Sequence, residues 1–129
     1  MSRIAYGFLV GRGVLELIRY DVAQALFGFG RIQRRLAKQV PEVRRFTDDS
    51  ERLVCAAMLM ATCLYWKPVR CLQRAICTVR LLRSHGVAAR LVIGYRPVPF
   101  SSHAWVEVGS RIVNDSPVYQ RSLRVLYTA

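Results

Sequence analysis

The pattern of apolar and polar residues changes period along the chain. Before residue 86 the apolar residues recur at helical spacing, and after it they cluster in short runs rich in β-branched and aromatic side chains. The first helical stretch covers residues 14–38, where Gly28 and Gly30 are expected to weaken or bend the helix. The chain therefore begins with helices and continues with strands.

Two further helices are predicted between residues 47 and 86. Residues 47–50, Thr-Asp-Asp-Ser, are N-cap residue types, and the run ERLVCAAMLMATCLYW that follows is apolar almost all round, as in a buried helix. The Lys-Pro pair at 67–68 ends that helix. The next helix is predicted from about Arg70 to His85, because its apolar residues form one stripe and a glycine follows as a C-terminal stop.

Three later runs are predicted to be strands: RLVIGY at 90–95, HAWVEV at 103–108 and RIVND at 111–115. The segment RPVPFSS contains two prolines and is predicted to be a loop, and a Gly-Ser pair at 109–110 marks a hairpin. The C-terminal YQRSLRVLYTA fits a short helix or a closing strand. Helices followed by an antiparallel sheet predict an α+β fold.

Length and composition fit one folded domain. The chain has 129 residues, of which 53% are hydrophobic and 22% charged, so there is enough apolar material for a core and general disorder is excluded. We expect a single domain over residues 1–129, with a helical first half over 1–66 and a catalytic core over 67–129. No segment recurs, which excludes a repeat array.

The N-terminal residues carry a short apolar run that Arg12 and Glu16 interrupt. No small-residue cleavage site follows, so no signal peptide is expected. No stretch reaches the roughly 18 apolar residues that a membrane-spanning helix needs. We expect an amphipathic helix packed on its own domain, with docking on a partner or on a membrane surface as the alternatives.

The charge balance is strongly basic: 20 Lys and Arg against 8 Asp and Glu give a net charge of +12. Such a charge attracts an acidic partner, whether nucleic acid, membrane surface, acidic peptide or another subunit. The arginines are scattered, and no helix-turn-helix or aromatic-basic strand motif is present. A nucleic-acid-binding module is therefore the less favoured of the alternatives.

The cysteines do not have the spacing of a zinc site. They contain no CxxC pair, and the sequence has only two histidines, so we expect neither a structural metal nor a cofactor. Reduced thiols in a cytoplasmic protein are the simplest interpretation. The four cysteines are Cys55, Cys63, Cys71 and Cys77.

Cys71 is the candidate nucleophile because it lies in the first turn of the predicted third helix. A helix N-terminus presents unpaired N–H groups and positive potential, both of which favour a thiolate, and Arg70 and Arg74 act in the same direction. The other three cysteines lie in apolar helical runs, where a thiol behaves as a small hydrophobic group.

His103 and Asp115 are the candidate partners of this thiol. A three-residue hairpin loop over 108–110 sets them opposite each other on one face, whereas a two-residue loop sets them on opposite faces; we predict the three-residue register. Nucleophile, base and orienting acid then follow in chain order, as in known triads. The plain alternatives are a structural cysteine, a satisfied polar histidine and a turn-forming aspartate.

The stretch CLQRAICTVRLLRSHGVAARLVIGY, followed by PFSSHAWVEVGSRIVND, resembles the leader peptidases of lasso-peptide biosynthesis, which belong to the transglutaminase-like group of papain-type cysteine enzymes. The resemblance covers about residues 66–126. It rests on Cys-Leu-x-Arg from Cys71, His-Ala-Trp-Val-Glu from His103 and Asn-Asp at 114–115. It implies a nucleophile-bearing helix packed on a small antiparallel sheet, as in a transglutaminase-like or papain-like core.

The resemblance also implies roles and partners. Cys71 would be the nucleophile, His103 the general base and then acid, and Asp115 the residue that orients the imidazole. The implied activity is removal of the leader from a lasso-peptide precursor, after which a separate ATP-dependent cyclase closes the core. Because 129 residues leave no room for a leader-gripping module, we expect a separate leader-binding protein that docks on the helical half.

Two features of the predicted chemistry have alternatives: the acceptor of the acyl group and the oxyanion donor. A transglutaminase-like acyl transferase would use the same triad with an amine in place of water, and sequence does not separate the two reactions. The backbone N–H of Cys71 is the expected oxyanion donor, with Tyr65 or Trp66 as side-chain candidates. His85 is expected to interact with the C-terminal end of its helix.

Overall fold

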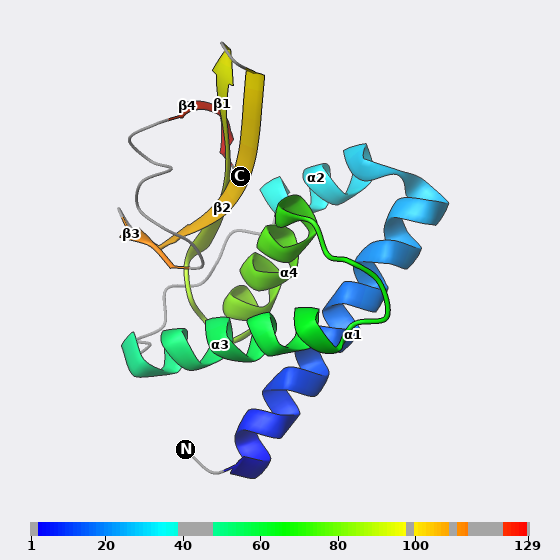
Figure 1. Ribbon diagram of the computed structural model, residues 1–129, viewed down its shortest axis with the longest axis vertical. Helices are drawn as coiled ribbons and strands as arrows, with labels where there is room; N and C mark the ends of the chain where they lie inside the picture. The colour runs from blue at the N-terminus through cyan, green and yellow to red at the C-terminus, as the bar shows by residue number, and fades with distance from the viewer. Residues whose placement is uncertain (1–2, 39–47, 98–99, 109–110, 114–122, 129) are drawn as a thin grey trace.

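The computed structural model describes residues 3–38, 48–97, 100–108, 111–113 and 123–128. Within these residues four helices precede a four-stranded antiparallel sheet, which confirms the α+β class (Figure 1). The elements are α1 (Arg3–Phe27), α2 (Phe29–Lys38), α3 (Asp48–Leu64), α4 (Cys71–Ser84), β1 (Ala89–Pro97), β2 (Phe100–Val108), β3 (Arg111–Ile112) and β4 (Arg124–Thr128). None of the helices among the described residues is long and apolar enough to cross a bilayer.

Two glycines set helix boundaries: the end of α4 at Gly86 was predicted, whereas the single helix predicted over 14–38 begins at Arg3 and is divided at Gly28. Gly28 has a φ of +76°, a left-handed conformation that costs glycine little, and it separates α1 from α2. Gly86 has a φ of +83° and ends α4. The N–H groups of Gly86 and Val87 donate to the carbonyls of Arg83 and Leu82, each at 3.0 Å, which is the Schellman pattern of a helix end.

The first two strands are longer than predicted. Ala89 to Pro97 pair with Phe100 to Val108 without a break, so the predicted loop over RPVPFSS is wrong. Pro97 did not prevent pairing because it ends its strand, where a missing N–H is tolerated. The C-terminal segment forms β4, which pairs with β1 and settles the choice between helix and strand.

The hairpin register also differs from the prediction. Val108 pairs with Arg111 and Glu107 with Ile112, which is the register of a two-residue loop; the predicted pairing of Glu107 with Arg111 is wrong. The N–H of Val113 donates to the carbonyl of Val106 at 3.0 Å and continues the same register. Two-residue loops match the natural twist of paired strands, which favours this outcome.

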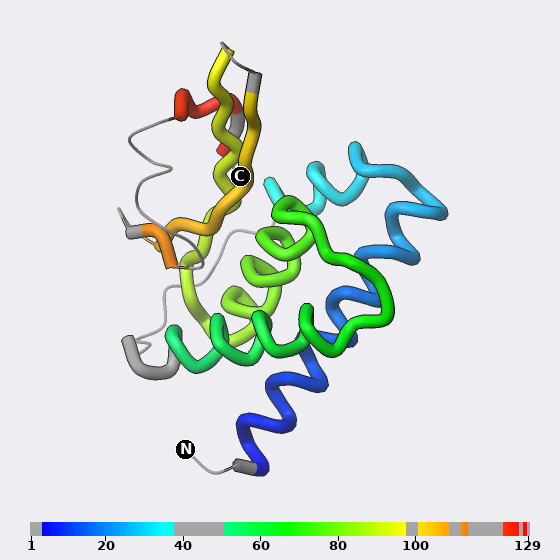
Figure 2. Tube along the Cα trace, in the orientation of Figure 1, coloured from blue at the N-terminus to red at the C-terminus, as the bar shows by residue number. Residues whose placement is uncertain are grey.

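The helices cover one face of the sheet. α4 packs against β1 and β2, and α1 and α3 pack against α4 and against each other (Figures 1 and 2). Leu17, Met58, Ile76, Leu91 and Val106, from five different elements, are at most 1% exposed and belong to one core. Both halves of the chain therefore contribute to the same core.

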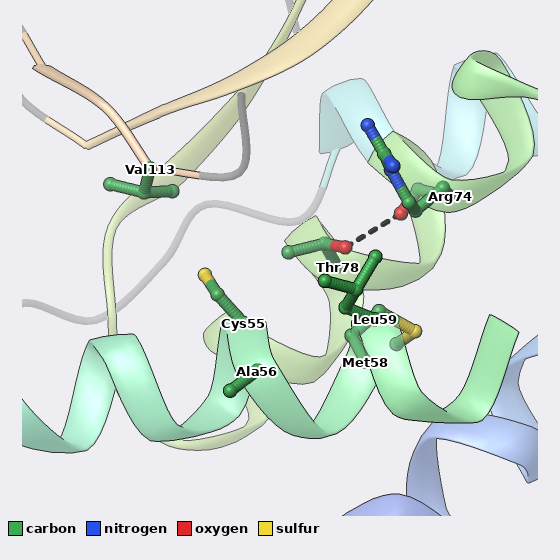
Figure 3. A pocket seen from close by; sticks show the side chains of 7 residues that line it. All are labelled: Cys55, Ala56, Met58, Leu59, Arg74, Thr78 and Val113. Atoms are coloured by element: carbon green, nitrogen blue, oxygen red, sulfur yellow. Dashed lines mark hydrogen bonds between the residues drawn. The ribbon is translucent and has the colours of Figure 1, made fainter. Parts of the chain in front are cut away.

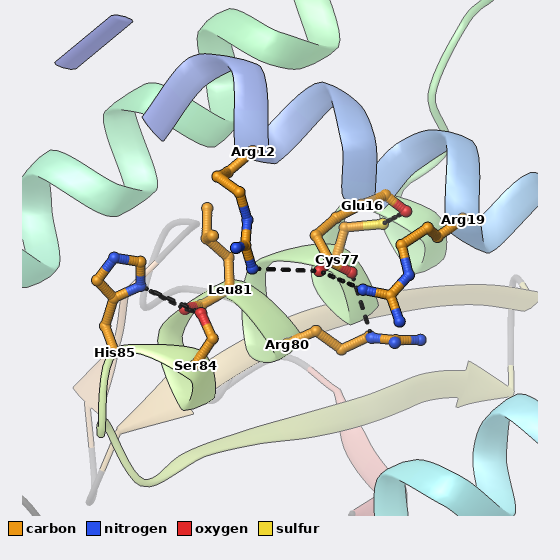
Figure 4. Close-up of polar contacts among 8 residues, drawn as sticks. All are labelled: Arg12, Glu16, Arg19, Cys77, Arg80, Leu81, Ser84 and His85. Atoms are coloured by element: carbon orange, nitrogen blue, oxygen red, sulfur yellow. Dashed lines mark hydrogen bonds and ion pairs between the residues drawn. The ribbon is translucent and has the colours of Figure 1, made fainter. Parts of the chain in front are cut away.

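A buried carboxylate ties α1 to α4 (Figure 4). Glu16 is 4% exposed and lies 3.3 Å from Arg80 Nε of α4 and 3.5 Å from Arg19 of its own helix. Arg12 lies 4.0 Å away on the other side. A buried charge is tolerated when it is paired, and the pair with Arg80, the one arginine of the three that lies on α4, joins α1 to the helix that carries Cys71.

Candidate active site

Cys71 is the first residue of α4 and is half-buried, as predicted for the start of this helix. The preceding Arg70 is extended and its side chain makes no capping hydrogen bond. The N–H groups of the first turn are therefore not satisfied by that side chain, and the positive end of the helix dipole lies at the thiol. Such a position can hold an anion or a developing oxyanion.

The other cysteines have different surroundings. Burial, reinforced by the charge of Glu51, raises the pKa of Cys55 to about 12. Burial likewise raises the pKa of Cys77, which is fully buried in α4. Cys63 is exposed on α3, so the prediction of an apolar environment is wrong for this residue. Only Cys71 combines access with a helix N-terminus.

The segment before Cys71 is anchored to α1 through Asp21. One carboxylate oxygen of Asp21 accepts a hydrogen bond from the Tyr65 hydroxyl. The other lies 2.8 Å from Lys67 Nζ and accepts a hydrogen bond from Gln73 Nε2 at 3.2 Å. One residue of α1 thus holds side chains on both sides of the nucleophile.

The electrostatics of this cluster favour the charged form of Asp21. Burial alone raises the pKa of Asp21, but hydrogen bonds from Lys67 and Tyr65 and the charge of Lys67 outweigh it, so the pKa lies below its usual value. Burial and the bond to Asp21 raise the pKa of Tyr65 to about 12. The Tyr65 hydroxyl donates its one hydrogen bond to Asp21, so Tyr65 does not serve as an oxyanion donor in this arrangement. Trp66, the other side-chain candidate, is 81% exposed.

His103 lies on β2, opposite Gly94 of β1. Its ring stacks on that of Trp105, with centroids 6.4 Å apart and an interplanar angle of 22°. The indole of Trp105 is fully buried and donates a hydrogen bond to Glu107 Oε1 at 3.1 Å. A Cβ at Gly94 would come within 2.5 Å of the Trp105 ring, so this glycine makes room for the ring that supports His103.

Cys71 and His103 lie toward the same end of two packed layers, but α4 and the imidazole lie on opposite faces of the sheet. α4 and β2 run in the same direction in Figure 1, so the start of the helix and the first half of the strand lie at one end. Ala104 and Val106 alternate with His103 and belong to the core beneath α4. Because side chains alternate along a strand, the imidazole lies with Trp105 on the face away from α4.

Asp115 lies outside the described residues. The observed pairing of Glu107 with Ile112 is the register of a two-residue loop, so the three-residue loop on which the predicted facing of His103 and Asp115 depended is wrong. Ile112 is the last residue of β3, and the described pairing ends with the hydrogen bond of Val113. The role of Asp115 therefore stays a prediction.

A cavity of about 190 Å³ lies between α3 and α4 (Figure 3). Arg74 and Thr78 follow Cys71 by three and seven positions, on the same side of α4, and both line the cavity. The Thr78 hydroxyl donates to the Arg74 carbonyl at 2.7 Å, which leaves walls that are mostly apolar. The remaining lining residues are Cys55, Ala56, Met58, Leu59 and Val113. Sequence reasoning missed this cavity because no motif links its walls.

His85 has the structural role expected from its position. Its Nδ1 lies 2.9 Å from the Leu81 carbonyl, which can only accept, so the imidazole donates to the last turn of α4. This contact is at the opposite end of α4 from Cys71, and it confirms that His85 interacts with the helix C-terminus.

Comparison with known proteins agrees with the resemblance seen in the motifs. Over 56 residues the chain is 45% identical to the Microcin J25-processing protein McjB of Escherichia coli, a match that covers 43% of this chain and 27% of that protein. No solved structure matches the chain. The sequence pattern of the transglutaminase-like superfamily matches residues 14–128. With a match over nearly its whole length and a helix-then-sheet architecture, the chain belongs to the transglutaminase-like superfamily.

Proposed function

We propose that this protein is a cytoplasmic cysteine peptidase that removes the leader from a ribosomally made lasso-peptide precursor. The observation that carries the proposal is the position of Cys71, accessible and uncapped at the start of α4, in a chain of this superfamily. The partial match to a microcin-processing protein supports a peptide precursor as the substrate.

In the proposed reaction the Cys71 thiolate attacks the carbonyl carbon that joins leader to core. The first-turn N–H groups of α4 stabilise the oxyanion. The C–N bond breaks, His103 protonates the departing amine of the core, and the leader remains as a thioester on Cys71. Water then attacks the thioester, His103 accepts its proton, and the leader leaves as a carboxylic acid.

Proton transfer requires the imidazole of His103 to reach the start of α4. β1 borders β2 on one side of His103, and on the other side the described part of β3 pairs only with the last residues of β2, so that edge of β2 has no described strand beside His103. We propose that the imidazole meets Cys71 across this edge and that Asp115 orients it. Because the imidazole lies on the face of the sheet away from α4, this contact requires the imidazole to turn around that edge.

The cavity between α3 and α4 lies farther along the side of α4 on which Cys71 lies, although Cys71 does not line it. Its walls are mostly apolar and its position follows that of Cys71 along one side of α4. We assign it to an apolar side chain of the peptide near the cleaved bond. Arg74, which also lines it, supplies positive charge for the peptide backbone or an acidic neighbour.

The proposal includes partners. The match covers only 27% of the microcin-processing protein, so the activities of that whole protein are not assigned to this chain. A separate leader-binding protein presents the precursor in our account, and a cyclase takes the new N-terminus of the core.

Cleavage of a lasso precursor by the purified chain tests the proposal. With the leader-binding protein present, Cys71→Ala should lower the rate by several orders of magnitude, because it removes the nucleophile. Cys63→Ala is the matched control, since Cys63 is also accessible but lies on α3. A Cys71→Ala protein that cleaves at the wild-type rate, or an equal loss in Cys63→Ala, would contradict the assignment.

Membership of the transglutaminase-like superfamily favours one alternative, acyl transfer to an amine. The two reactions share the thioester and differ in what releases it. An acyl transferase would give a leader joined to an amine instead of a free acid, which mass spectrometry of the leader product distinguishes.

A further inference from the structure

The outward face of α1 carries a continuous apolar seam. Seven small or apolar residues, separated alternately by four and three positions, are all exposed to solvent. The exposed fraction is 85% for Ile4, 67% for Phe8 and 51% for Val22. We call this set the outer seam; its residues are Ile4, Phe8, Gly11, Leu15, Ile18, Val22 and Ala25.

The inner face of the same helix is also apolar. Leu9, Leu17 and Tyr20 are buried in the core, so α1 carries apolar residues on both of its faces. A helix that is apolar all round is normally covered all round, and a contiguous exposed apolar patch is typical of an interaction site. Alternating steps of four and three residues are the heptad pattern by which one helix packs against another.

Two glycines of α1 support close approach from outside. A Cβ at Gly13 would lie 2.9 Å from Ala61 Cβ, so the packing of α1 on α3 explains that glycine. A Cβ at Gly7 or Gly11 would meet nothing within 4 Å. Each glycine in a helix interior costs about 1 kcal/mol relative to alanine, and no contact among the described residues requires these two. They leave room for the backbone of another helix.

The flanks of the outer seam indicate the charge of the partner. Arg12 and Arg19 follow the seam residues Gly11 and Ile18, with side chains 37% and 52% exposed. Both already contact Glu16, but a guanidinium has five N–H donors and can bind a second carboxylate. A second copy of this chain would bring the same arginines and another net charge of +12. A partner with acidic flanks is complementary instead.

We propose that the outer seam of α1 binds an apolar, acid-flanked α-helix of a separate protein. A narrow seam one helix wide fits a helix better than a lipid surface, which favours a broad apolar face. The inference does not depend on peptidase chemistry at Cys71, so the two proposals fail separately.

Binding of a designed peptide to the full chain tests the proposal. The probe is a fluorescent three-heptad helix with leucine at the seam positions and glutamate at the flanks, and fluorescence anisotropy measures its affinity. We expect the double variant Leu15→Glu, Ile18→Glu to bind roughly tenfold more weakly or worse, because it places charge in the seam. Leu64→Glu, on the exposed part of α3, is the control and should bind like wild type.

A second variant guards against a folding defect. Gly11→Gln adds bulk at the seam without an internal clash, so it should keep or raise the unfolding midpoint of the wild type and still weaken binding. Equal affinity for a lysine-flanked peptide, or no loss in either seam variant, would overturn the proposal. So would seam-dependent binding to phosphatidylglycerol vesicles without peptide binding, or a seam-dependent dimer in sedimentation.

Discussion

At the residue scale, the surroundings of His103 depend on the contact between Trp105 and Gly94. The Trp105 ring, on which His103 stacks, lies over Gly94 of the neighbouring strand. A hydrogen atom in place of a side chain at Gly94 lets the indole lie flat against β1. The position of the imidazole therefore follows from a glycine opposite it in the sheet.

Gly94→Ala should destabilise the fold and disturb this face. Its Cβ would lie 2.5 Å from Cη2 and 2.7 Å from Cζ3 of Trp105, and 2.9 Å from Leu123 Cβ. Overpacking of this kind costs about 1–3 kcal/mol of unfolding free energy, which urea denaturation measures. Gly30→Ala in α2 meets nothing within 4 Å and should be neutral or stabilising by up to about 1 kcal/mol. Equal effects of the two substitutions would contradict this packing.

Residue-scale signals predicted some site residues and not others. Cys71 could be found because a helix start is a local feature of the sequence. The hairpin register that was predicted to set His103 opposite Asp115 was wrong, because it depends on one residue of loop length and both loops were compatible with the sequence. Asp21 was missed because the side chains that it binds lie far along the chain and meet it only after packing.

At the element scale, α1 acts as the support of the nucleophile helix. Glu16 pairs with Arg80 in the middle of α4, and Asp21 binds Gln73 near its start. Gln73 also donates to the Leu17 carbonyl at 3.4 Å. These contacts fix the start of α4, and with it Cys71, relative to α1.

Asp21→Asn should lower stability and change its dependence on pH. The substitution removes the carboxylate that accepts from Tyr65 and pairs with Lys67, at a cost of about 1–3 kcal/mol near neutral pH. Because the folded-state pKa of Asp21 is lowered, its stabilisation is present above the unfolded pKa and is lost as pH falls through the folded pKa.

Urea denaturation from pH 7 down to about pH 3 measures this effect, since the unfolded carboxyl titrates near pH 4. The difference between wild type and Asp21→Asn should shrink as the pH falls. Lys67→Met, which removes one partner of the same cluster, should not add fully to Asp21→Asn in the double variant. A constant difference at every pH, or full additivity, would show that the cluster does not act as described.

Local sequence predicted the effect of glycine on the helices but not the extent of the strands next to Pro97. Gly28 and Gly86 adopt positive φ angles, a conformation that other residues rarely take. Pro97 only marks the end of a strand, and its neighbours still pair with β2. The extent of a strand is decided by its partner, which local sequence does not show.

At the scale of the whole molecule, the helical half has two surfaces with separate uses. Its inner surface joins the sheet in one core and supports α4. Its outer surface carries the outer seam, so the expectation of a helix packed on its own domain is met while a second face stays exposed. The sequence of α1 places apolar residues on both faces of the helix, but only the folded structure shows which face the domain covers.

The fold also shows where some of the residues behind the net charge of +12 lie. Two of the described acidic residues, Glu16 and Asp21, are paired with arginines and a lysine of the same chain. The outer surface is therefore left with a basic balance, which favours acidic peptide or protein partners and steers their approach. A leader-binding protein with an acid-flanked helix would satisfy both the charge and the outer seam.

The central claim is that Cys71 forms a thioester with the leader and that water releases it. Precursor cleavage in ¹⁸O-labelled water, followed by mass spectrometry of the leader fragment, tests this most directly. We expect a free leader acid that carries one oxygen from the solvent, formed by the wild type and by Cys63→Ala but not by Cys71→Ala. A leader joined to an amine, or labelled leader acid still formed by Cys71→Ala, would contradict it.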